Sequence, residues 1–255
     1  MNLDLEGRAF LITGGTDGLG LALARTLLHE GASVSVCGRD LDRLAAAATL
    51  LGESALCVAA DVTNSAQLTE FVERTLVKFG RLDGVVSNAG HASAGPIVAS
   101  TDEGWRADFE LKVIAAVALA RMTAPALTET KGSILNVLSI MAKSPGANST
   151  PTAASRAAGL AMTKALAAEL GPQSVRVNAI LIELIESGQW ERRAQQANMS
   201  LGDFYNAVLS SQSIPLGRFG RAEEFAALAS FVLSPRASYL TGVGINLDGG
   251  MSPVV

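Results

Sequence analysis

The sequence predicts an α/β protein built on a doubly wound parallel sheet of about seven strands, with helices on both faces. Short apolar runs alternate with longer stretches rich in Ala and Leu from end to end of the 255 residues. These runs lack the polar–apolar alternation of a half-exposed sheet, which is typical of parallel strands buried on both faces. No Pro- or Ser-rich linker, repeat or low-complexity block divides the chain, so we expect one domain over residues 1–255.

The expected strands and helices follow one another in a regular order. Gly31 and Gly80 lie just beyond two of the helices, where glycine commonly ends a helix. In the first part of the chain we expect strands at residues 8–13, 33–37, 55–60 and 84–87, and helices at residues 19–29, 40–51 and 65–79. In the remainder we expect helices at residues 102–126 and 152–170, and strands at residues 133–138, 175–181 and 242–247.

The composition excludes several classes of function. With 20 Lys and Arg against 24 Asp and Glu, the net charge is −4, so no basic excess is present to neutralise nucleic-acid phosphates. The longest purely apolar run, Val113 to Ala120, is far shorter than the ~20 residues that span a bilayer. Cys37 and Cys57 suit a reducing compartment and have no metal-ligand spacing, and the acidic start of the chain is unlike a signal peptide. We therefore expect a cytoplasmic protein with no membrane span and no metal site.

A glycine-rich turn, Thr13 to Gly20, separates the first expected strand from the first expected helix. Gly14, Gly18 and Gly20 let the chain turn tightly and approach a pyrophosphate closely. The N-terminus of the following helix offers free N–H groups and a partial positive charge to phosphate. Because the turn has this strand–turn–helix context, it predicts a dinucleotide-binding site, with an ordinary loop as the alternative.

Motifs along nearly the whole chain resemble those of the short-chain dehydrogenase/reductase family, whose members have a Rossmann fold. The glycine-rich turn matches the family's TGxxxGxG motif, and Ser87 to Gly90 is similar to its NNAG motif. Further matches occur in chain order at Asp61-Val62, Arg176-Val177-Asn178, Pro215-Leu216-Gly217-Arg218, Glu223-Glu224, Thr241-Gly242 and Asp248-Gly249-Gly250. The resemblance implies an NAD(P)-dependent oxidoreductase that acts on an alcohol or a carbonyl compound.

The resemblance also implies which residues contact the nicotinamide cofactor. Arg39, just after the second strand, can form a forked contact with a 2′-phosphate and favours NADP over NAD. Two observations oppose this preference: Asp17 stands where NADP-preferring relatives often carry a basic residue, and Asp40 is able to pair with Arg39. The expected cofactor contacts are Gly14, Thr16, Asp17, Gly18, Leu19, Gly20, Arg39, Asp61, Val62, Asn88, Ala89, Gly90, Arg156, Glu183 and Ser187.

Most of the family's catalytic residues are replaced in this sequence. The family uses a Tyr as proton donor and a Lys one helical turn later, which lowers the pKa of that Tyr. A Ser binds the substrate carbonyl, and an Asn on the preceding helix holds a relay water. Here Ser139 keeps the Ser, whereas Thr152 stands at the Tyr position and Arg156 at the Lys position. Lys112 stands at the Asn position.

The replacements change the chemistry that the site can perform. A Thr hydroxyl is a far weaker acid than a phenol, although it can hydrogen-bond a carbonyl oxygen. Arg156 keeps a permanent charge and can bind the cofactor ribose, while Lys112 adds a second cation. His91 titrates near neutrality and is a further candidate proton carrier, with packing beside the cofactor as its alternative role. Glu183 replaces part of the family's Pro-Gly and either faces solvent or lies at the cofactor, paired with Lys112 or Arg156.

The resemblance implies a substrate lid at about residues 184–213, a stretch rich in polar residues. Trp190 and Tyr205 suggest an apolar pocket beneath it, and Tyr205 is a conceivable replacement acid. Arg192 and Arg193 either attract an anionic substrate or lie on a solvated helix face.

Three functions are compatible with these residues. The first is an NAD(P)-dependent oxidoreductase with a rearranged site, in which Ser139 and Thr152 hold the carbonyl oxygen of a small-molecule substrate. The second is a cofactor-binding sensor or structural subunit without hydride transfer, and the third is a lyase or isomerase without a redox step. The apolar helices around residues 113–120 and 152–170 imply, through the resemblance, a homotetramer, with a dimer as the alternative.

Overall fold

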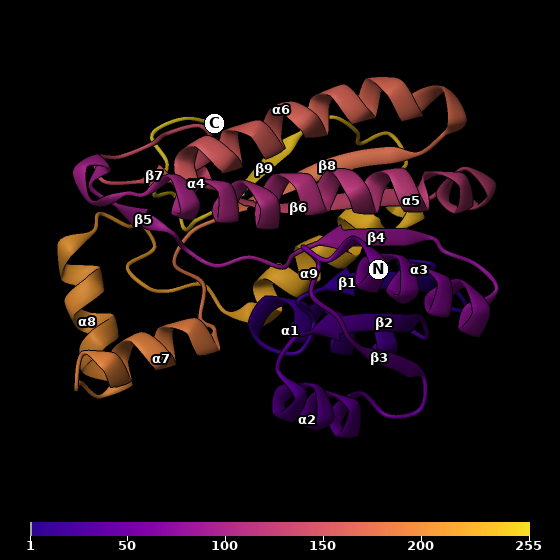
Figure 1. Ribbon diagram of the computed structural model, residues 1–255, viewed down its shortest axis with the longest axis horizontal. Helices are drawn as coiled ribbons and strands as arrows, with labels where there is room; N and C mark the ends of the chain where they lie inside the picture. Colours follow the sequence, from indigo (N-terminus) through magenta and orange to yellow (C-terminus); the bar gives the residue numbers. More distant parts are fainter. Residues whose placement is uncertain (1) are drawn as a thin grey trace.

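The computed structural model describes residues 2–255 and confirms the expected α/β fold (Figure 1). Parallel strands form a seven-stranded sheet in the order β3-β2-β1-β4-β6-β8-β9. The strand order reverses between β1 and β4, and ligands of doubly wound sheets bind at this switch point, beyond the carboxyl ends of the strands. The strands are β1 (Ala9–Thr13), β2 (Ser33–Gly38), β3 (Ala55–Ala59), β4 (Gly84–Ser87), β6 (Ser133–Ser139), β8 (Arg176–Ile182) and β9 (Gly244–Leu247).

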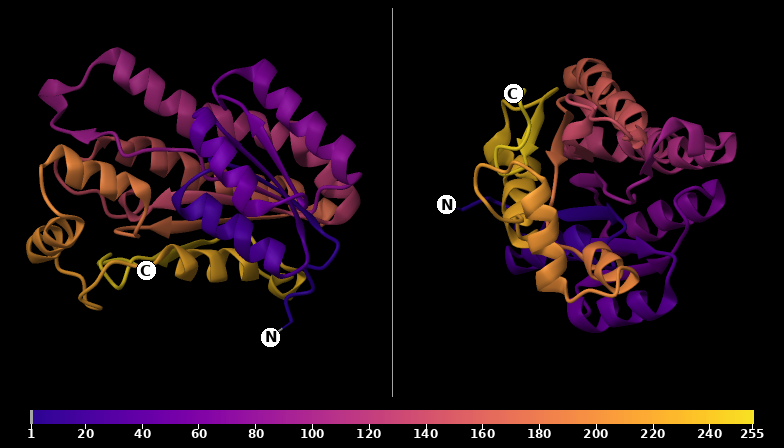
Figure 2. Two further views of the ribbon diagram at one scale, coloured as in Figure 1. Left: turned by 90° about the horizontal axis from the view of Figure 1, so that it is seen from below. Right: turned by 90° about the vertical axis from the view of Figure 1, so that its left-hand side faces the viewer.

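Helices cover both faces of the sheet, as two further views show (Figure 2). Because successive side chains of a strand point to opposite faces, Phe10 and Ile12 enter one apolar core and Leu11 enters the other. This explains why the strands are apolar throughout. One face carries α1 (Gly18–His29), α2 (Leu41–Leu51) and α9 (Ala222–Leu233), and the other carries α3 (Ser65–Phe79), α5 (Ala115–Thr130) and α6 (Thr152–Leu170).

Local sequence signals set most element boundaries close to the expected ones. Asn64 caps α3 with its side chain, and Gly80 ends that helix in the left-handed conformation, at φ 68°. The helix expected to end at residue 126 continues to Thr130, because the Thr130 hydroxyl donates to the carbonyl oxygen of Leu82 and holds the last turn. The last strand begins at residue 244 rather than 242, because Gly242 has a positive φ of 72°. Helix α9 was not among the expected elements.

The longest helical segment runs from Asp102 to Thr130 and comprises α4 (Asp102–Phe109), a π-helical turn (Glu110–Ile114) and α5. This segment is long and apolar enough to cross a membrane, and 39% of its most apolar 18-residue stretch is buried in the protein. Core helices of globular proteins can be equally long and apolar. Here Leu119 and Leu127 lie in the core beneath the sheet, which accounts for the apolar composition.

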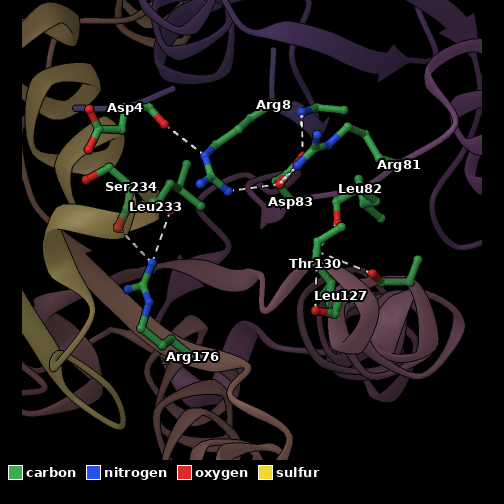
Figure 3. Close-up of polar contacts among 12 residues, drawn as sticks. Asp4, Arg8, Arg81, Leu82, Asp83, Leu127, Thr130, Arg176, Leu233 and Ser234 are labelled. Atoms are coloured by element: carbon green, nitrogen blue, oxygen red, sulfur yellow. Dashed lines mark hydrogen bonds and ion pairs between the residues drawn. The ribbon is translucent and has the colours of Figure 1, made fainter. Parts of the chain in front are cut away.

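Two buried charged residues, Asp83 and Arg176, hydrogen-bond neighbouring segments at the amino ends of the strands, opposite the switch point (Figure 3). Asp83 precedes β4, and its carboxylate accepts hydrogen bonds from the guanidinium groups of Arg8 and Arg81. Arg176 begins β8 and donates to carbonyl oxygens of the last turn of α9 and of Ser234. Because the last carbonyls of a helix have no intrahelical partners, Arg176 satisfies acceptors that would otherwise be buried unpaired.

The segment expected to form a lid folds into two helices, α7 (Gly188–Gln196) and α8 (Leu201–Ser211). They extend from one end of the body, at the same end as the short antiparallel pair β5 (Ala94–Gly95) and β7 (Thr150–Pro151) (Figures 1 and 2). Among the α7 side chains only that of Ala194 is buried, which accounts for the polar sequence.

Candidate active site

A cleft of ≈ 880 Å³ opens beyond the carboxyl ends of the strands, at the switch point between β1 and β4. Its walls bring together the glycine-rich turn, the ends of β2 and β4, the start of α6 and the segment after β8. All of the expected cofactor contacts line it except Gly20, which lies beneath the turn. The expected catalytic residues Ser139, Thr152, Arg156 and His91 line it as well.

The glycine-rich turn has the conformation that a phosphate cradle needs. Gly14 and Gly18 have positive φ values of 65° and 51°, a region that glycine adopts without strain. A Cβ atom on Gly14 would lie 2.9 Å from the Cα of Ala89, and one on Gly20 would lie 2.4 Å from the Gly14 carbonyl oxygen. Asn88 fixes the turn by donating to the carbonyl oxygens of Thr13 and Gly14. The residues present therefore fit a dinucleotide at the N-terminus of α1.

The far end of the cleft carries two arginines. Arg39 pairs with Asp61 at 3.3 Å and not with Asp40, so the pairing considered from the sequence is wrong. Asp40 instead caps α2 and pairs with Arg43 at 2.8 Å. Arg43 also lies 3.7 Å from Asp17. Arg43 was not among the residues expected from the sequence, although its spacing of three residues from the capping Asp40 is typical of side chains that meet on a helix.

The hydroxyl of Thr152 lies in a buried polar network. Its Oγ1 accepts hydrogen bonds from the backbone N–H of Ser93 at 2.9 Å and from the Lys112 ammonium at 3.0 Å. Lys112 forms an ion pair with Asp108, whose other carboxylate oxygen accepts from the Ser155 hydroxyl at 2.6 Å. The side chains of Lys112 and Asp108 are 0% and 1% exposed, so this pair is fully desolvated. The network therefore places a cation directly on the hydroxyl of Thr152, where the family resemblance implies a Tyr.

The π-helical turn Glu110–Ile114 has Lys112 at its centre. Such turns are rare and occur frequently at functional sites. Asp108 and Ser155 were not among the residues expected from the sequence. The signal available for Asp108 was its spacing of four residues from Lys112, whereas nothing in the sequence pairs it with Ser155, 47 residues away.

The charges of the network depend on burial and on each other. Burial, together with the nearby charge of Arg156, lowers the pKa of Lys112 to about 8, although Asp108 opposes this effect. Burial raises the pKa of Asp108, but hydrogen bonds from Lys112 and Ser155 outweigh it and leave that pKa below its ordinary value. At neutral pH Lys112 is thus a cation, with a pKa within reach of proton transfer.

Ser139 lies at the end of β6 and makes no hydrogen bond with Thr152 among the described residues. Its Oγ donates to the Glu183 carboxylate at 2.9 Å and accepts from the backbone N–H of Met141 at 3.2 Å. Glu183 is half-buried and lines the cleft, as one of the alternatives expected from the sequence places it, but it forms no ion pair with Lys112 or Arg156 among residues 2–255. Burial raises the pKa of Glu183, although the hydrogen bond from Ser139 opposes this.

Arg156 lies between the cleft and the sheet. It donates from Nη1 to the carbonyl oxygen of Val137 at 2.8 Å. Its buried Nε has no hydrogen-bond partner among residues 2–255, which leaves a donor for a cofactor hydroxyl. His91 lies on the loop after β4, where partial burial of its ring and the charge of Lys112 lower its pKa.

Of the two helices that follow β8, α7 contacts the glycine-rich turn, and α8 carries Tyr205. Arg192 of α7 pairs with Asp17 at 3.1 Å, and Arg193 lies over the Trp190 ring. Tyr205 stacks on Phe219 with ring centroids 4.2 Å apart, and burial raises its pKa. This arrangement does not favour Tyr205 as a replacement acid.

A model of the enoyl-(acyl carrier protein) reductase family matches residues 14–252. The chain belongs to the short-chain dehydrogenase/reductase family. A 3-oxoacyl-(acyl-carrier-protein) reductase of Thermotoga maritima is 34% identical over 251 residues, which cover 97% of this chain and 98% of that protein. Members of the family are oxidoreductases that act on alcohols and carbonyl compounds.

Solved structures agree with this assignment. L-sorbose reductase from Gluconobacter frateurii, complexed with NADPH and L-sorbose, is 33% identical, with a TM-score of 0.95 over 100% of both chains. A short chain oxidoreductase from Pseudomonas aeruginosa PAO1, described as containing an atypical catalytic center, has a TM-score of 0.93 and 33% identity in its apo form, which covers 99% of this chain and 100% of that one. Its NADPH-bound structure has a TM-score of 0.91 and 34% identity over 97% and 98% of the two chains. The family thus binds nicotinamide cofactors in this fold.

Proposed function

We propose that this protein is an NADPH-dependent oxidoreductase that interconverts a carbonyl compound and an alcohol, with Thr152 as the proton donor and Lys112 as the cation that supports it. The hydrogen bond of 3.0 Å between the Lys112 ammonium and the Thr152 hydroxyl carries the proposal. It gives a weakly acidic hydroxyl a cationic partner in a buried setting, where electrostatic interactions are strong.

The mechanism follows from the hydrogen bonds of Thr152. Its oxygen already accepts from Ser93 and Lys112, so its own proton is the one left to donate to a substrate carbonyl oxygen. As that oxygen gains negative charge, Thr152 passes its proton forward and Lys112 resupplies it. Asp108 and Ser155 hold Lys112 in place during this transfer. When bound, the cofactor supplies or accepts the hydride.

The residues around the cleft are suited to NADPH. The glycine-rich turn and the α1 N-terminus would hold the pyrophosphate, and Arg156 would bind the nicotinamide ribose. Arg39 and Arg43 are both accessible, with side chains 67% and 46% exposed, and both would pair with a 2′-phosphate. We expect Arg39→Ala to weaken NADPH binding about tenfold or more and to leave NADH binding unchanged, as measured by titration of cofactor fluorescence. An equal loss for both cofactors would overturn the preference for NADP.

A second candidate, a cofactor-binding protein without hydride transfer, is favoured by the hydrogen bond from Ser139 to Glu183, because it occupies the hydroxyl that the family uses to bind a carbonyl. A panel of ketones, aldehydes and alcohols, followed by NADPH absorbance, separates the candidates. Turnover supports the oxidoreductase. Binding of NADPH without turnover of any compound supports the second candidate, and product formation at constant absorbance identifies a lyase or isomerase.

For the assembly, we infer a homotetramer in the cytoplasm, with a dimer as the alternative. The observation in support is an apolar outer surface on α5 and α6. Ile114 and Val117 are 49% and 42% exposed, and the outward side chains of α6 include the exposed Ala157, Ala161 and Ala165. Small and apolar side chains of this kind suit close packing between helices of two subunits.

A further inference from the structure

Glu183 places a carboxylate at the reacting end of the cleft. It directly follows β8, and its side chain lines the cleft together with Ser139 and Thr152. The nearest hydrogen-bond donor is the Ser139 hydroxyl, at 2.9 Å. A carboxylate has about four lone-pair positions, so this single bond leaves Glu183 with capacity to accept further hydrogen bonds from a ligand.

The Ser139–Glu183 pair presents acceptors to the cleft and no free donor. Ser139 uses its proton on Glu183 and one of its lone pairs on the N–H of Met141. The remaining lone pairs of both side chains can receive hydrogen bonds only from donor groups. A plain ketone or an acyl thioester has no such donor beside its carbonyl and would leave the remaining lone pairs of the carboxylate without a donor where it displaces water.

The surrounding charges select among donor groups. Arg156 lines the same end of the cleft, and its charge lowers the pKa of Lys112 and opposes the rise in the pKa of Glu183. A substrate ammonium would meet the Arg156 charge, whereas a substrate carboxylate or phosphate would meet Glu183 itself. A hydroxyl group donates a hydrogen bond without adding charge, and it avoids both conflicts.

We infer that the substrate is a neutral polyhydroxylated ketone or alcohol, whose hydroxyl next to the reacting carbon donates to Glu183 while the reacting oxygen lies on Thr152. This inference rests on the proposed function. In the reductive direction a bound NADPH would supply the hydride for the new C–H bond and would itself be oxidised. The C=O π bond breaks, and the oxygen takes the Thr152 proton, which Lys112 replaces. The hydroxyl held by Glu183 is unchanged.

Hydroxyacetone and acetone are a matched pair of probes, because they differ by one hydroxyl beside the carbonyl. We expect kcat/KM for hydroxyacetone to exceed that for acetone by about tenfold or more, the effect of a hydrogen bond to a charged group. In Glu183→Ala the ratio falls toward one, and in Glu183→Gln, whose amide oxygen still accepts, part of it remains. Glu186→Ala removes an exposed carboxylate three residues away and keeps the parent ratio. A ratio that is unchanged in Glu183→Ala overturns the inference.

Calorimetric titration of D-sorbitol into the NADPH-loaded protein provides a readout without turnover. Binding that weakens about tenfold in Glu183→Ala and remains in Glu186→Ala supports the inference, even if no compound is turned over and the proposed redox function fails. Equal sorbitol binding by the parent and Glu183→Ala, or no binding by either, overturns it while leaving NADPH-dependent reduction of other carbonyls intact.

Discussion

At the residue scale, the pH dependence of carbonyl reduction reports on Lys112. Because the protonated form supplies the proton and the pKa of Lys112 is about 8, we expect kcat/KM to be constant below that pH and to fall as the pH rises through it. Reductive turnover measured from neutral to alkaline pH checks this. A rate that stays constant well above pH 8 would exclude Lys112 as the proton source.

In the proposed mechanism Asp108 positions Lys112 and acts through it. This role can be tested with the same dependence of kcat/KM on pH. Its negative charge raises the pKa of Lys112, so Asp108→Asn is expected to move the falling limb to lower pH. The control is Asp102→Asn on the same helix, where the side chain is 81% exposed and distant from the network. If both variants keep the parent profile, Asp108 has only a structural role.

Motif matching placed Ser139, Thr152, Arg156 and Lys112 in or beside one cleft, since the spacing of motifs along a parallel sheet determines where its strand ends meet. It could not predict their hydrogen bonds. Lys112 contacts a hydroxyl 40 residues away, and Ser139 contacts a carboxylate 44 residues away. Such contacts depend on how separate strands and helices pack, which local sequence does not encode.

At the element scale, α7 is attached to the glycine-rich turn through the 3.1 Å pair between Arg192 and Asp17. Both side chains are partly exposed, so the pair contributes at most about 1 kcal/mol. We expect Arg192→Ala to speed NADPH dissociation by up to about fivefold, measured by stopped-flow fluorescence. Gln195→Ala, on the same helix, is the control. No change in Arg192→Ala would show that α7 does not retain the cofactor.

The junction of β8 with α9 depends on Arg176. Replacement by Met would leave the α9 carbonyl oxygens buried without donors, and we expect a loss of about 3 kcal/mol in the free energy of unfolding. Arg236→Met removes an exposed pair with Asp4 and should cost less than about 1 kcal/mol. Urea unfolding measures both. Equal losses would contradict the structural role given to Arg176.

The sequence predicted the strands and the central helices well, because their apolar runs are long and their caps are local. It did not predict α7, α8 and α9 as separate helices. The α7 sequence has a single buried side chain, Ala194, so it lacks a clear apolar stripe. Helix α9 has the opposite character, because buried residues occupy most of its surface and leave no clear polar face.

At the scale of the whole molecule, the apolar surface of α5 and α6 predicts self-association. We expect a tetramer or dimer in sedimentation velocity, and a shift to smaller species in Val117→Glu, which places a charge on that surface. Val77→Glu is the matched control, because Val77 is 87% exposed and belongs to α3, outside the surface of α5 and α6. If the parent is a monomer, or if the two variants sediment alike, this surface is not an interface between subunits.

In the proposed mechanism Thr152, supported by Lys112, donates the proton during NADPH-dependent carbonyl reduction. The most direct measurement compares single-turnover NADPH oxidation by the parent, Thr152→Ser and Thr152→Val, each saturated with cofactor and hydroxyacetone. We predict that Thr152→Ser stays within about tenfold of the parent, and that Thr152→Val, which has the same shape without the hydroxyl, is slower by about 100-fold or more at unchanged NADPH affinity. Oxidation by Thr152→Val at the parent rate would contradict the account.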